Sequence, residues 1–115
     1  MNDDLLNFIT PKGSIQFGEL PEIYPWSILR KQIKSLKGAF ETGYVSDDVT
    51  EFWLDFEYRE HKFSINNNLG DFWFFVENPE CPDEILSEVL KNFDKIYSYP
   101  KIYLYLYDLF RKFSS

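Results

Sequence analysis

The sequence predicts an α+β fold, in which an antiparallel sheet of about four strands, in a β-α-β-β-β-β-α-α order, has helices packed on it. Runs of aromatic and β-branched residues, separated by short turn sequences, fill residues 39–77. This pattern is typical of successive hairpin strands. Apolar residues at helical spacing flank these runs, at residues 25–38 and 78–93. No linker or internal repeat interrupts residues 1–115, which we expect to form a single α+β domain.

The first third of the chain is expected to contain one short strand and one helix. Residues 14–17 (SIQF) lie between a PKG turn and Gly18, and predict the strand. The proline-rich residues 19–25 (ELPEIYP) are expected to be irregular. The helix then begins with Pro25 in its first turn and ends at Gly38. Its apolar residues recur at helical spacing: Trp26, Leu29, Ile33 and Leu36.

The middle of the chain predicts four strands, at residues 39–46, 50–60, 61–66 and 71–77. The sequence INNNLGD at residues 65–71 is a strong hairpin signal, because Asn and Gly tolerate the positive φ of a tight turn.

A second helix is expected over residues 78–93. Pro82 suits its first turn, and Asp83 and Glu84 complement the positive end of the helix dipole. Its apolar stripe consists of Ile85, Leu86, Val89, Leu90 and Phe93. Residues 101–113 (KIYLYLYDLFRKF) predict a third helix when read at the helical period. Their first half also alternates at period two, so a strand there stays open.

The chain is acidic, with a net charge of −7. This charge argues against nucleic acid or an anionic membrane as a partner. Residues 39–80 hold ten acidic residues against two basic ones, a local charge of −8, whereas the helix at residues 25–38 has four basic residues and no acidic one. The acidic region is either a solvated surface or a field that steers a basic protein partner.

The sequence predicts a cytoplasmic protein. Its start has no basic segment followed by an apolar run, so we expect no signal peptide. No apolar stretch approaches the roughly 20 residues that cross a bilayer. The single cysteine, Cys81, excludes an internal disulfide and agrees with a reducing compartment.

The predicted strands have two apolar faces instead of one. In residues 51–59 and 71–77, alternate residues form an aromatic core face that the helices can cover. The opposite face mixes Trp53, Trp73 and Phe75 with carboxylates. Two interpretations follow. Either the C-terminal segment, with residues 103–107, folds over the indoles as a second small core, or the face is a docking site for a protein.

The docking interpretation assigns partner binding to an aromatic centre and a ring of carboxylates. Trp and Tyr supply much of the binding energy of protein interfaces, and peripheral charges aid the encounter. The candidate partner-binding residues are Asp47, Asp48, Glu51, Trp53, Asp55, Glu57, Asp71, Trp73, Phe75 and Glu77.

Nothing in the sequence predicts an enzyme, a cofactor or a metal site. His61 is the only histidine and Cys81 has no CxxC partner, so a zinc site is not expected. A thiolate of Cys81 would be stabilised at a helix N-terminus, although a packing role is the simpler interpretation. The acidic pairs Asp47/Asp48 and Asp55/Glu57 lack further ligand spacing. The α-β-β-β-α order resembles the double-stranded-RNA-binding domain, but the second helix is acidic where those domains are basic.

Residues 63–93 (FSINNNLGDFWFFVENPECPDEILSEVLKNF) resemble the C-terminal part of small bacterial proteins that join an aromatic hairpin to a helix started by Cys-Pro. In general character the whole chain is similar to the immunity proteins of contact-dependent inhibition and other polymorphic toxin systems. Those proteins are small, acidic, cytosolic and α+β. The resemblance implies a non-enzymatic inhibitor that covers a cognate toxin, often a basic nuclease. The alternative is a small regulatory module that forms a homodimer through the same aromatic surface.

Overall fold

The computed structural model describes residues 5–47, 49–98, 106 and 109. Its strands are β1 (Phe8–Ile9), β2 (Ile15–Pro21), β3 (Phe40–Ser46), β4 (Phe52–Tyr58), β5 (His61–Asn68) and β6 (Asp71–Val76). Its helices are α1 (Trp26–Ile33), α2 (Asp83–Asp94) and the short 3₁₀ helix η1 (Lys95–Ser98). The predicted third helix, at residues 101–113, falls almost entirely outside the described residues.

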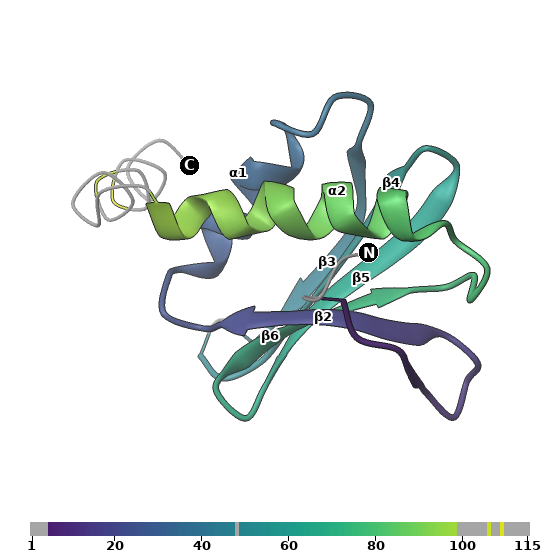
Figure 1. Ribbon diagram of the computed structural model, residues 1–115. Helices are drawn as coiled ribbons and strands as arrows, with labels where there is room; N and C mark the ends of the chain where they lie inside the picture. The colour runs from purple at the N-terminus through teal and green to yellow at the C-terminus, as the bar shows by residue number, and fades with distance from the viewer. Residues whose placement is uncertain (1–4, 48, 99–105, 107–108, 110–115) are drawn as a thin grey trace.

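The six strands form one antiparallel sheet in the order β1-β2-β6-β5-β4-β3. Both α-helices lie on the same face of this sheet, with α2 running diagonally across it (Figure 1). The α+β class is confirmed, whereas the prediction of about four strands was wrong. The structure has six strands because β1 and β2 extend the sheet beyond β6.

The strand predicted at residues 14–17 is present as part of β2, but its extension to Pro21 and the strand β1 were not predicted. β2 continues through Pro21, although residues 19–25 were expected to be irregular, because Pro21 sits at the end of the strand, where a missing N–H is tolerated. A bulge between Gln16 and Gly18 also breaks the alternation of side chains. With only two residues, β1 is too short to give a periodic signal.

The bulge in β2 controls how closely α2 approaches the sheet. Phe17 is fully buried, and Gly18, the next residue, also faces the helices. A Cβ atom on Gly18 would lie 2.8 Å from Leu90 Cδ1. Glycine at this position therefore leaves the space that the buried Leu90 side chain of α2 occupies.

The core forms between the helices and the predicted inner face of the sheet. Phe52, Leu54, Phe56 and Tyr58 of β4 are all buried, as the alternation predicted, and so is the whole apolar stripe of α2. Phe93 of α2 packs against Phe56 and Phe74, with ring centroids 5.7 and 5.3 Å apart. Each large side chain of this kind contributes about 1.5–3 kcal/mol when it is fully buried.

A polar cluster inside the core joins the ends of the two helices. The side chain of Gln32 donates to the backbone oxygen of Asn92 (2.7 Å), and the side chain of Asn92 donates to the backbone oxygen of Gln32 (2.9 Å). The Ser35 hydroxyl lies 2.8 Å from both Asn92 Oδ1 and the Gln32 carbonyl oxygen. The prediction that this helix continues to Gly38 was wrong: α1 ends at Ile33, and the backbone N–H groups of the next three residues bond carbonyls three residues back instead of four.

Two hairpins are closed by two-residue turns with positive φ. Leu69 and Gly70 form the β5–β6 turn (φ 51° and 85°), which confirms the predicted hairpin. Arg59 and Glu60 form the β4–β5 turn with φ of 50° and 67°, although neither is glycine. L-residues adopt this conformation at a cost of about 1–2 kcal/mol. The β4–β5 turn is therefore a local source of instability.

Replacing Glu60 by glycine is expected to stabilise the protein by about 0.5–1 kcal/mol, because glycine removes the left-handed strain at some cost in unfolded-state entropy. Urea unfolding of wild type and Glu60→Gly measures this difference. Glu80→Gly is the matched control, because Glu80 is also exposed but has no positive φ. An equal or lower unfolding free energy for Glu60→Gly would show that the turn is not strained.

Candidate functional site

The sheet face opposite α1 and α2, here called the open face, carries most of the predicted partner-binding residues. Strand register places Trp53 and Trp73 on either side of Asn66, and Asp55 and Phe75 on either side of Ser64. Residues paired across antiparallel strands point to the same side of the sheet. Neither α-helix covers this side (Figure 1). Of residues 103–107, which one interpretation places over this face, the structure describes only Leu106, which is 43% exposed.

Trp53 is held in a defined orientation at the centre of the open face. Its ring is stacked with that of Phe75, at a centroid distance of 6.3 Å and an interplanar angle of 12°. Its Nε1 donates to Asp55 Oδ1 (2.8 Å), and the same oxygen accepts from Ser64 Oγ (2.7 Å). Despite these contacts, Trp53 is 45% exposed. A large aromatic surface is thus fixed in place and presented to solvent.

Trp73 is less accessible than Trp53. It is half-buried, and its ring contacts Phe75 at a centroid distance of 6.4 Å. Its Nε1 atom and the Oδ1 atom of Asn66 are buried without a hydrogen-bond partner among the described residues. Strand alternation alone left open whether the two tryptophans are adjacent. They lie on β4 and β6, with β5 between them, and the ring of Phe75 contacts both.

Carboxylates surround this aromatic centre. Glu57 is paired in register with Lys62, and the backbone N–H of Glu77 donates to the carbonyl of Lys62 on the other side. Asp71 lies beyond Trp73 on β6, and Glu19 pairs with Trp73 from β2. Glu19 was not among the predicted site residues, because β2 was not expected to continue that far. The open face is therefore acidic around an aromatic middle.

Two of the predicted steering charges, Asp47 and Glu51, lie in the β3–β4 loop instead of on the open face. Asp47 Oδ1 accepts hydrogen bonds from the backbone N–H groups of Val49, Thr50 and Glu51, at 2.7–2.9 Å. Its other oxygen accepts from the Thr50 hydroxyl at 2.5 Å. Glu51 is exposed at the end of this loop, and Asp48 lies outside the described residues. Asp47 thus organises the loop.

The hydrogen bonds from Glu51, Thr50 and Val49 hold the pKa of Asp47 well below its ordinary value. A lowered folded-state pKa means that the ionised carboxylate stabilises the fold above about pH 4, the ordinary pKa of an unfolded aspartate, and that this contribution is lost as the pH falls further. Asp47→Asn is therefore expected to be less stable than wild type at neutral pH, with a difference that shrinks steadily below about pH 4. Urea unfolding across this range measures the difference, and a gap independent of pH would contradict the assignment.

A groove at one side of the open face was not predicted. The β1–β2 turn, residues 10–14, stands beside Trp53 and Phe75 and encloses about 630 Å³ with them. Lys62, Ser64 and Glu77 complete its lining, with Lys12 on the turn. The PKG sequence signalled a turn, but its position over the sheet depends on β2 pairing with β6.

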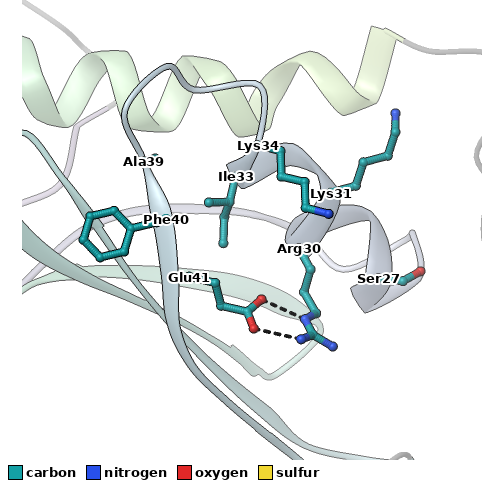
Figure 2. A pocket seen from close by; sticks show the side chains of 8 residues that line it. All are labelled: Ser27, Arg30, Lys31, Ile33, Lys34, Ala39, Phe40 and Glu41. Carbon is teal, nitrogen blue, oxygen red and sulfur yellow. Dashed lines mark hydrogen bonds and ion pairs between the residues drawn. The ribbon is translucent and has the colours of Figure 1, made fainter.

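A second concavity of about 530 Å³ lies between α1 and β3 (Figure 2). Arg30 of the basic helix forms two hydrogen bonds with Glu41, both of 2.8 Å, and its guanidinium lies 4.1 Å from the centroid of the Tyr44 ring. Lys31 and Lys34 lie along the same edge (Figure 2). Arg30 therefore joins α1 to β3.

Cys81 is a packing residue before α2. It is 5% exposed, and burial together with the nearby charge of Asp83 raises the pKa of its thiol to about 11. The sequence had left open a thiolate stabilised by the helix N-terminus. The surroundings of Cys81 instead favour the neutral thiol.

Cys81 is expected to react with Ellman's reagent at least about a hundredfold more slowly in the folded protein than in the urea-unfolded chain, because only the thiolate attacks. With a pKa of about 11, roughly one thiol in a thousand is ionised at about pH 8. Similar rates in the two states would mean that the thiol is accessible and activated.

Within the described part of the chain, no three His, Cys, Asp or Glu side chains are placed to hold a metal ion together. No helix among the described residues is long and apolar enough to span a membrane. Comparisons with protein-family models, curated proteins and solved structures found no significant match to this chain.

Proposed function

We propose that this protein binds a basic protein on its open face and acts as an immunity protein that neutralises a cognate bacterial toxin. The proposal rests on the exposure of Trp53. Its ring is held in place by Asp55 and Phe75, yet it is 45% exposed on a face that neither α-helix covers. Rigid, exposed aromatic side chains are the usual anchors of protein interfaces.

Charge supports a basic partner. The strands and loops of residues 39–80 carry a net charge of −8, and Glu19, Glu57, Asp71 and Glu77 stand around the aromatic centre. Such a rim accelerates encounter with a positively charged surface and repels like-charged competitors. Further exposed apolar side chains, Phe8 on β1 and Val45 on β3, extend the contact area in register with this centre.

The proposal is tested by co-purifying a tagged copy from its native host, expressed with the neighbouring genes, and identifying bound proteins by mass spectrometry. A stoichiometric basic protein that is toxic without this chain supports the immunity function. Recovery of the chain alone as a dimer would overturn it and favour the self-associating module.

A further inference from the structure

Trp53 and Asp55 form an exposed pair of an aromatic ring and a carboxylate on β4. Both side chains point to the open face, because they alternate along the strand. The indole Nε1 donates to Asp55 Oδ1 at 2.8 Å, and the indole ring is nearly parallel to the ring of Phe75. These contacts fix the plane of the indole, although 45% of Trp53 is exposed. A flat aromatic surface thus lies beside a carboxylate.

The second oxygen of this carboxylate is available to a partner. Both hydrogen bonds to Asp55, from Trp53 and Ser64, use Oδ1, and Oδ2 accepts none from the described residues. On the edge strand β3, the residue opposite Asp55 is Gly43. A Cβ atom on Gly43 would lie 3.4 Å from Asp55 Oδ2. Because Gly43 has no side chain, a donor can approach this oxygen from the edge of the sheet.

The charge around this pair is negative. Glu57 follows Asp55 on the same face of β4, and among the described residues neither carboxylate forms an ion pair with a lysine or an arginine. Glu77 adds a third carboxylate at the groove, where the cations are Lys12 and Lys62. The carboxylates therefore outnumber the ammonium groups, and the balance favours a cation beside Trp53.

The helix-covered side of the sheet holds a filled version of the same arrangement. The guanidinium of Arg30 lies 4.1 Å from the centroid of the Tyr44 ring. It also forms two hydrogen bonds of 2.8 Å with Glu41 (Figure 2). A planar guanidinium can stack on an aromatic ring while it binds a carboxylate, whereas the ammonium of lysine is compact and strongly hydrated. Trp53 and Asp55 offer the same two contacts, and no arginine of the described residues occupies them.

We propose that the open face recognises an arginine side chain of the basic partner, which stacks on Trp53 and donates a hydrogen bond to Asp55 Oδ2. The inference rests on the proposed binding of a basic protein and names the side chain that this protein places at the centre of the contact. Arginine and tryptophan are both enriched among the residues that dominate the binding energy of protein interfaces. A lysine at the same place would contribute its charge without the planar stacking.

The test titrates the isolated protein with N-acetylarginine amide. Two controls are N-acetylcitrulline amide, which has a similar planar end without the charge, and N-acetyllysine amide, which has the charge without the planar end. The readout is the indole N–H signal of Trp53 in heteronuclear NMR, identified by its loss in Trp53→Phe. The arginine compound is expected to shift this signal saturably with a Kd of about 10 mM, at least about threefold tighter than either control.

The indole signal of Trp26 is the internal control of this titration. Its Nε1 donates to Glu22, away from the proposed contact, and its signal is expected to stay constant. Absence of a saturable shift at Trp53, or equal binding of the arginine compound and either control compound, would overturn the proposal.

Asp55→Asn separates the arginine site from the proposed function. The amide oxygen can still accept from Trp53 and Ser64, so the substitution removes the charge and keeps the indole in place. Binding of the arginine compound is expected to weaken at least about threefold, and that of the co-purified partner about tenfold. Asp94→Asn, the same change at an exposed position of α2, is expected to alter neither. Unchanged binding of either ligand by Asp55→Asn contradicts the arginine site alone, whereas failure of the proposed function appears as the absence of a toxic partner.

Discussion

Trp53→Ala is expected to weaken binding of the protein partner at least about thirtyfold, or about 2 kcal/mol, which is the loss typical of a central aromatic anchor. The indole is exposed and pre-oriented, so truncation removes contact area without a rearrangement of the core. The folded protein loses the stacking on Phe75 and the hydrogen bond to Asp55. These losses are expected to lower the free energy of unfolding by about 1 kcal/mol. Calorimetric titration and urea unfolding measure the two effects.

Ile23→Ala is the control for Trp53→Ala. Ile23 is 52% exposed in the connection between β2 and α1, outside the open face, so its truncation is expected to change affinity by less than about 0.5 kcal/mol. Trp53→Phe keeps an aromatic ring but loses the bond to Asp55, and an intermediate affinity is expected. If Trp53→Ala binds as wild type does, the open face is not the contact surface. If it merely unfolds the protein, Trp53 is a core residue.

Asn92→Ala is expected to lower the free energy of unfolding by about 2–4 kcal/mol. Asn92 is 3% exposed, and its side chain bonds both the Gln32 backbone and Ser35. The substitution removes two buried hydrogen bonds and leaves a small cavity. Asn92→Leu fills most of that space, so a comparable loss for both variants assigns the effect to the lost hydrogen bonds.

The measurement is urea unfolding of the two Asn92 variants, with Lys91→Ala as the control. Lys91 is exposed on the same helix, and its truncation is expected to stay within about 0.5 kcal/mol of wild type. A double-mutant cycle with Ser35→Ala isolates the side-chain bond between Ser35 Oγ and Asn92 Oδ1, for which a coupling of about 1 kcal/mol is expected. Additive losses would mean that the two residues act separately.

Much of the fold was predictable from local patterns. In α2, β4 and β6, buried residues recur at the regular spacing of a helix or a strand. The spacing of apolar residues within each segment is therefore enough to predict which residues are buried. The β5–β6 hairpin was predictable because Gly70 marks its turn, although Leu69 instead of an asparagine takes the other position with positive φ. The extent of β2 was not predictable, since a bulge between Gln16 and Gly18 hides its alternation and its partners on β6 lie far away in the sequence, as in the pair Ile15 and Val76.

The candidate site was predictable in its parts and not in its assembly. Alternation placed Trp53, Asp55 and Phe75 on one face, yet the stacking of Trp53 on Phe75 across β5 depends on register between strands. Asp47 was expected to steer a partner, but its carboxylate instead binds three backbone N–H groups of its own loop. The Gln32–Asn92 pair joins residues 60 positions apart, for which local sequence carries no signal.

The most direct test of the central claim is hydroxyl-radical footprinting of this protein, alone and saturated with the co-purified partner. Oxidation of Trp53 and Phe8 is expected to fall severalfold in the complex, while that of Leu69, exposed at the β5–β6 turn, stays constant. Undiminished oxidation of Trp53 in the complex, with protection confined to the cleft between α1 and β3, would contradict binding at the open face.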